Sequence, residues 1–89
     1  MRRVKIIVAG RVQGVYFRYF TQKEAEKLGM VGNVKNLDDG RVEIIAEANN
    51  DVLEKFIRWC HKGPITARVD EVEISELARD EPLIGFVRN

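Results

Sequence analysis

Residues 4–18 read VKIIVAGRVQGVYFR and carry the chain from a strand, through a short loop, into a helix. Val4, Ile6 and Val8 stand at every second position, which predicts a strand over residues 4–9 with these three side chains on one face. The next segment, residues 10–14, has a glycine at each end and is too rich in glycine for a strand interior. We therefore expect a loop there.

The residues after this loop predict a helix over residues 15–28. Apolar side chains recur at helical spacing, at Phe17, Phe20, Ala25 and Leu28. The charged residues between them fall largely on the opposite side, as in a helix with one buried face. Gly29 follows the last turn and supplies the left-handed backbone at which many helices end.

A hairpin is predicted next. Residues 31–37 and 41–47 have the composition of strands, and the DDG of residues 38–40 between them is a strong tight-turn signal. In the second of these strands Val42, Ile44 and Ala46 alternate with other residues, which places them on one face.

A second helix and two more strands complete the chain. Residues 49–51, NND, are all favoured N-cap residues, and the helix after them is expected to end at about Lys62, before the GP of residues 63–64. Residues 68–77 and 84–88 are predicted strands. The side chains expected to face the core in these three elements are Leu53, Phe56, Ile57, Cys60, Val72 and Ile74.

The order of these elements, β-α-β-β-α-β with an additional short C-terminal strand, predicts an α+β fold. Right-handed crossovers would place both helices on one face of an antiparallel sheet, which is the ferredoxin-like α/β sandwich. Residues 1–89 are the size of a single domain and contain no linker or low-complexity stretch. This fold hosts many functions, so the fold alone does not predict one.

Composition limits the function classes. The net charge of +1 argues against a nucleic-acid binder that relies on bulk positive charge. No apolar segment is long enough to span a bilayer, so no membrane association is expected. Cys60 is the only cysteine, which excludes an intrachain disulfide and favours the reducing cytosol, so we expect a cytoplasmic protein.

The loop between the first strand and the first helix has features that favour binding of an anion. Main-chain N–H groups at the start of a helix have no partner within the helix and lie at the positive end of its dipole. Arg18 falls in the first predicted turn, and its planar guanidinium matches a phosphate in a two-point contact. The residues by themselves leave a second interpretation open, an ordinary strand–helix turn followed by a surface arginine.

The stretch GRVQGVYFR, residues 10–18, resembles the first motif of the acylphosphatase family almost letter for letter. The resemblance implies that the backbone of this loop binds phosphate and that the closing arginine, Arg18, is essential for catalysis. By this resemblance, the phosphate-binding residues are Gln13, Gly14, Val15, Tyr16, Phe17 and Arg18.

The stretch GNVKNLDDGRVE, residues 32–43, resembles the second motif of that family. The resemblance gives Asn36 the task of orienting the attacking water, a task that suits an uncharged amide beside a dianion. Taken alone, Asn36 could equally be a strand-end residue before a turn.

The chain departs from the family's usual pattern at two positions: Asn33 replaces the usual aromatic residue and Ala48 replaces a usual glycine. The GFVRN of residues 85–89 also matches the core of this motif, but it lacks the turn and is read as part of a last strand at a chain end, where fraying is usual.

The resemblance covers nearly the whole chain and implies an acylphosphatase: an enzyme that hydrolyses the carboxyl-phosphate bond of acyl phosphates without a metal or organic cofactor. Its expected partners are a small-molecule acyl phosphate and inorganic phosphate, the latter as product and competitive inhibitor. We expect a monomer. Two other functions stay open: a non-catalytic module that senses an anion or a protein, and an RNA-binding domain, which the net charge disfavours.

Several other residues are expected to be structural. Cys60 and His61 lack the further ligands that a zinc site needs, so we expect no metal site, and Cys60 fits the buried stripe of its helix. Asp38 and Asp39 are interpreted as turn formers. Tyr16 and Tyr19 could stack on a base in an RNA-binding protein, but their places beside the helix start favour packing or the rim of the anion site.

Overall fold

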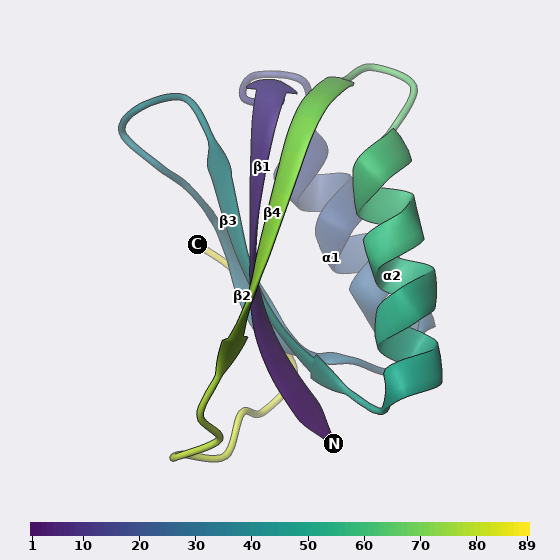
Figure 1. Ribbon diagram of the computed structural model, residues 1–89. Helices are drawn as coiled ribbons and strands as arrows, with labels where there is room; N and C mark the ends of the chain where they lie inside the picture. Colours follow the sequence, from purple (N-terminus) through teal and green to yellow (C-terminus); the bar gives the residue numbers. More distant parts are fainter.

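Two helices pack against one face of a five-stranded sheet in the computed structural model, which describes all residues from Met1 to Asn89 (Figure 1). The elements follow the predicted order. They are β1 (Arg2–Arg11), α1 (Phe17–Lys27), β2 (Val31–Asn36), β3 (Val42–Ala48), α2 (Asn50–Lys62), β4 (Arg68–Leu77) and β5 (Phe86–Arg88). Neither helix has the length and apolar content needed to cross a lipid bilayer.

The strands lie in the order β4-β1-β3-β2-β5. The first four are antiparallel to their neighbours, as expected. β5 departs from the expected antiparallel sheet, because it pairs with β2 in parallel. The reason is topological: after β4 the chain crosses to the opposite edge of the sheet, and it enters β5 from the same end as β2.

The core lies between the sheet and the two helices. Val4, Ile6 and Val8 of β1 are fully buried, and each is paired in register with a fully buried residue of β3. The helices contribute Phe17, Thr21, Ala25, Leu53, Phe56 and Cys60. Most of the predicted core is thereby confirmed. The exceptions are Leu28, Ile57 and Val72, which are only partly buried, and Phe20 and Ile74, which are exposed. Val72 and Ile74 lie on β4, an edge strand.

The segment around the first loop differs from its prediction in two ways. β1 continues through Gly10 to Arg11, with a register shift between Ala9 and Gly10. A Cβ at Gly10 would lie 2.2 Å from the carbonyl oxygen of Arg68, so only glycine allows β1 and β4 to approach this closely. α1 begins at Phe17, two residues later than predicted, because the N-cap residue Tyr16 adopts the left-handed conformation.

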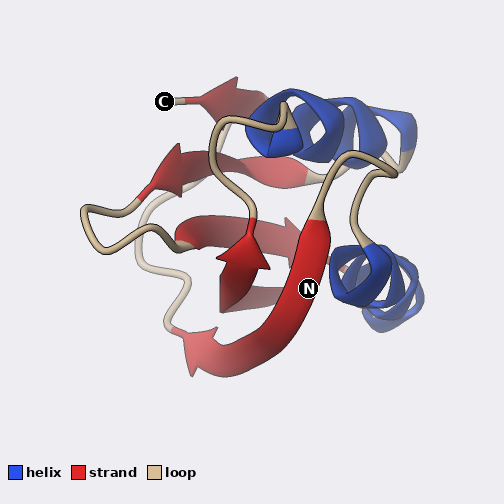
Figure 2. Ribbon diagram, turned by 90° about the horizontal axis from the view of Figure 1, so that it is seen from above, coloured by secondary structure: helices blue, strands red, loops and turns tan.

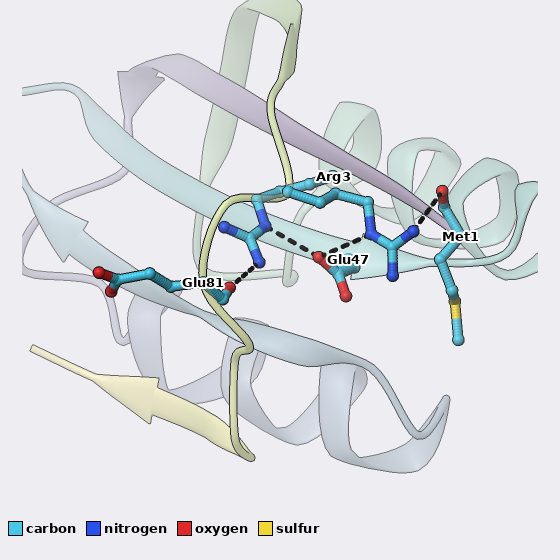
Figure 3. A network of polar contacts seen from close by, with 5 residues as sticks. Met1, Arg3, Glu47 and Glu81 are labelled. Atoms are coloured by element: carbon cyan, nitrogen blue, oxygen red, sulfur yellow. Dashed lines mark hydrogen bonds and ion pairs between the residues drawn. The ribbon is translucent and has the colours of Figure 1, made fainter.

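Residues 78–85 form a strap that links β4 to β5 across the sheet. Arg3 and Glu47 are cross-strand partners on the face that the helices leave open, with their Nε and Oε1 atoms 2.8 Å apart. The same Glu47 oxygen lies 3.4 Å from Nε of Arg79 in the strap, and Arg3 donates to the carbonyl oxygen of Glu81 (Figure 3). The hydrogen bond from Arg3 lowers the pKa of Glu47, with a further contribution from Arg79. These contacts hold the strap, and with it the start of β5, against the sheet.

Candidate active site

Three loops meet at one end of the sheet. Seen from above, the loop between β1 and α1 lies between the β2–β3 turn and the loop from α2 to β4 (Figure 2). The Gln13 side-chain amide donates to the carbonyl oxygens of Leu37, at 2.8 Å, and Arg41, at 2.9 Å, on one side. On the other side, Oγ1 of Thr66 donates to the carbonyl oxygen of Val15 at 2.6 Å. The β1–α1 loop is therefore fixed from both sides.

The β1–α1 loop leaves its main-chain donors without partners. The N–H groups of residues 13–16 donate no hydrogen bond within the protein. α1 has no side-chain cap and no acidic residue in its first turn. Positive φ angles at Gly14 (73°) and Tyr16 (63°) give the changes of hand found in backbone nests that bind anions. Together with the positive end of the helix dipole, these donors make a site for a negatively charged group.

Arg18, the second residue of α1, adds a cation to this site. Its guanidinium donates to the main-chain oxygen of Asn89 and forms no ion pair with an Asp or Glu side chain. Asn89 in turn donates from its N–H to the carbonyl oxygen of Val34 in β2, at 2.9 Å. The arginine is thus held toward β2 by its bond to the main chain at Asn89.

Asn36 is the last residue of β2 and lies on the same face of the sheet as α1. Side chains two residues apart in a strand share a face, and Val34 is completely buried against the helices. The register agrees, because Asn36 pairs with the buried Val42 of β3. Asn36 itself is exposed, at the end of the sheet where α1 begins. Its neighbour Leu37 accepts the Gln13 hydrogen bond, so the structure brings Asn36 beside the loop.

Three contacts at this site lie outside the sequence predictions. The side chains of Gln13 and Thr66 fix the loop, and Asn89, predicted at a fraying end, makes two hydrogen bonds. For Gln13 a signal existed, because an amide side chain between two apolar residues can reach two carbonyls at once. Thr66 and Asn89 act across 51 and 71 residues of sequence, and no local pattern reports such contacts.

The residues to which the sequence analysis gave no catalytic role occupy structural positions. Cys60 is completely buried, which raises the pKa of its thiol and confirms its place in the core. Asp39 lies in the hairpin turn, where a hydrogen bond from the main-chain N–H of Arg41 lowers the pKa of the Asp39 carboxyl. The side chains of Asp39 and Arg41 also form an ion pair. The cations of Lys23 and Arg88 lie 5.5 and 5.6 Å from the centre of the Tyr19 ring, while Tyr16, within the β1–α1 loop, is 74% exposed.

Comparison with known proteins agrees with this geometry. The sequence profile of the acylphosphatase family matches residues 4–88. An acylphosphatase of Rubrobacter xylanophilus is 48% identical over 87 residues, covering 98% of this chain and 76% of the relative. The crystal structure of an acylphosphatase from Bacillus subtilis superposes with a TM-score of 0.95 at 43% identity, covering 100% of this chain and 99% of the other. An acylphosphatase structure from Coxiella burnetii gives a TM-score of 0.92 at 34% identity, with 99% and 92% covered. The chain belongs to the acylphosphatase family, whose members hydrolyse acyl phosphates.

Proposed function

We propose that the loop from Gln13 to Arg18, together with Asn36, is the active site in which this enzyme hydrolyses acyl phosphates to a carboxylate and inorganic phosphate. One observation carries the assignment. Main-chain donors without partners, an arginine that pairs with no Asp or Glu side chain and an exposed amide from another strand gather at one end and on one face of the sheet. Each is suited to one part of phosphoryl transfer.

The donor loop and Arg18 bind the phosphoryl group. The N–H groups of residues 13–18 surround its oxygens, and the guanidinium neutralises the charge that they carry. Fixed donors of this kind need no reorganisation when charge builds up in the transition state, which makes them effective catalysts. The two side-chain bonds of Gln13 and the Thr66 bond keep the loop in shape before the substrate arrives.

Asn36 positions the water. Its side-chain oxygen accepts a hydrogen bond from the water, and the water oxygen forms a bond to phosphorus as the bond from phosphorus to the acyl oxygen breaks. The electron pair leaves with the carboxylate, and the water proton passes to a phosphate oxygen. Because a carboxylate leaves easily, orientation and electrostatic stabilisation are enough, and neither a metal ion nor an organic cofactor is required.

The rest of the functional assignment follows from this chemistry. Inorganic phosphate has the same tetrahedral head as the substrate and competes for the donor loop. The activity is expected to reside in one domain, residues 1–89, acting as a monomer without nucleic acid. We assign the enzyme to the cytosol, because its single cysteine allows no intrachain disulfide.

The test is hydrolysis of benzoyl phosphate, followed by ultraviolet absorbance with EDTA present. The wild type is expected to turn over the substrate, and Arg18→Ala to lose at least about 10²–10³ in kcat/KM, the usual effect of removing a transition-state donor. Arg79→Ala is the matched control, because this arginine pairs with Glu47 in the strap. Near-normal turnover by Arg18→Ala would refute the assignment of this arginine.

Asn36→Ala separates catalysis from simple anion binding. This variant is expected to bind inorganic phosphate as the wild type does, measured by calorimetry, while losing turnover. A wild type that binds phosphate and never hydrolyses an acyl phosphate would instead identify a non-catalytic anion-sensing module.

A further inference from the structure

We infer, on the basis of the function proposed above, that the acyl group of the substrate lies against the apolar surface of the α2–β4 loop, at Ile65. The enzyme would therefore favour acyl phosphates with an extended apolar chain over acetyl phosphate. The inference rests on the direction in which the leaving group departs and on what the protein exposes there.

The direction follows from in-line displacement. The attacking and leaving oxygens lie on opposite sides of the phosphorus atom. The proposed water is held by Asn36 of β2, and β1, which leads into the donor loop, lies between β2 and β4 in the sheet order. A phosphoryl group in the donor loop is therefore attacked from the β2 side, and its acyl group leaves toward the β4 side.

The α2–β4 loop, residues 63–67, occupies that side. Thr66 is bonded to the carbonyl oxygen of Val15 within the donor loop, at 2.6 Å, so its neighbour Ile65 is only one residue from the site. The loop is held in a turn by the bond from Ala67 N–H to the carbonyl oxygen of Pro64, at 3.0 Å. Figure 2 shows this loop beside the donor loop, on the side away from the β2–β3 turn.

Ile65 presents its whole side chain to solvent, with an exposed fraction of 101%. It borders two shallow concavities. One, of about 280 Å³, combines the apolar side chains of Phe20, Trp59, Pro64 and Ile65 with three charged residues of α1, Lys23, Glu24 and Lys27. The other, of about 420 Å³, continues from Pro64 and Ile65 to Ala67 and is bordered by Lys62. These volumes suit part of a small molecule rather than a protein segment.

A carbon chain on the acyl group fits this surface by chemistry. Moving methylene groups from water to an apolar surface is favourable, and the gain grows with the apolar area that is covered. Acetyl phosphate has a single methyl group and cannot reach beyond the donor loop. Butyryl and hexanoyl phosphates can extend along Ile65 toward Trp59.

The experiment measures kcat/KM for acetyl, butyryl and hexanoyl phosphate with wild type, Ile65→Ala and Ile84→Ala. Ile84 is the matched control, since it is 89% exposed but lies in the strap, next to the residue that pairs with the start of β2. We expect kcat/KM of the wild type to rise with chain length. Ile65→Ala is expected to lower the hexanoyl-to-acetyl ratio about 3- to 10-fold, the size of effect that a few methylene contacts produce, with no change for Ile84→Ala.

Two results would overturn the inference: equal kcat/KM for the three substrates in the wild type, or equal hexanoyl-to-acetyl ratios in all three proteins. In either case the proposed function would still hold if the wild type hydrolyses acetyl phosphate and Arg18→Ala does not. Failure of the wild type to hydrolyse any of the three substrates would refute the proposed function itself. Because Ile65 contributes nothing to the core, its replacement does not endanger folding.

Discussion

The two helices begin in opposite ways. α2 has the N-cap Asn49, whose side chain accepts a hydrogen bond from the N–H of Val52 at 3.0 Å, and an acidic residue, Asp51, at its second position. α1 has Tyr16 at its N-cap in a left-handed conformation, no capping bond, and a cation, Arg18, at its second position. The first arrangement satisfies the helix donors and complements the dipole, whereas the second leaves the donors open and opposes the dipole.

Under the proposed function, this difference separates a helix start that stabilises the fold from one that binds the substrate. An aromatic residue with φ of 63° and an arginine at the positive end of a helix are both unfavourable for the isolated protein. Both are understandable if an anion completes the site, because a phosphate supplies the missing acceptors and the missing negative charge. Exchanging features between the two helix starts tests whether their roles differ in this way.

The largest effect is expected when α1 receives the residue that α2 has. Arg18→Asp replaces the cation with the acid found at the same position of α2. It should lower kcat/KM for benzoyl phosphate by at least about 10³, because a hydrogen-bond donor to the phosphoryl group is lost and a negative charge that repels this group is gained. The free energy of unfolding should change by less than about 1 kcal/mol, because relief of the dipole offsets the lost bond to Asn89. Denaturant unfolding and steady-state kinetics measure the two effects. A large loss of stability would mean that this arginine serves the fold.

A smaller effect, on stability alone, is expected at an arginine that does have a carboxylate partner. Glu47→Gln leaves Arg3, which is 9% exposed, without its ion pair, so Tm should fall further than after neutralisation of any other single carboxylate. The pKa of Glu47 is lowered from its ordinary value of 4.5, so its contribution is complete above that pH and is lost as the pH falls through the lower folded-state pKa.

The Tm of the wild type should therefore decline in acid more steeply than that of Glu47→Gln. Glu73→Gln, an exposed position in β4 with no ion pair, is the control. Identical acid profiles for wild type and Glu47→Gln would show that the strap does not depend on this cluster. Activity of the folded variant should match the wild type, since the cluster lies on the face of the sheet opposite to the helices.

The smallest effect is expected when α2 is made to resemble α1. Asn49→Ala removes the cap and should cost about 1 kcal/mol of stability, or about 4–8 °C in Tm for a domain of this size. Asp51→Asn removes only the charge at the same helix start and should cost about 0.3–1 kcal/mol. kcat/KM should be unchanged in both. A loss of activity with Asn49→Ala would contradict the separation of roles between the two helix starts.

The local rules predicted the elements well and their ends less well. The alternation of Val4, Ile6 and Val8, an N-cap among residues 49–51 and the turn of residues 38–40 all correspond to observed structure. The start of α1 was placed two residues early, because no propensity rule anticipates a tyrosine in the left-handed region. The parallel pairing of β5 was not predicted either, because it depends on the path of residues 78–85 across the sheet, which no local pattern reports.

The order of elements, the face that each one buries and the chemical character of the donor loop could be predicted from the sequence, because they follow from spacing, caps and glycines within a few residues. Which distant groups meet became clear only from the folded chain. Gln13 reaches the β2–β3 turn, Thr66 reaches Val15, and Asn89 receives Arg18. The physical reason is that hydrogen bonds between loops depend on the sheet order and strand register, which are set by packing of the whole core and leave no periodic trace in the sequence.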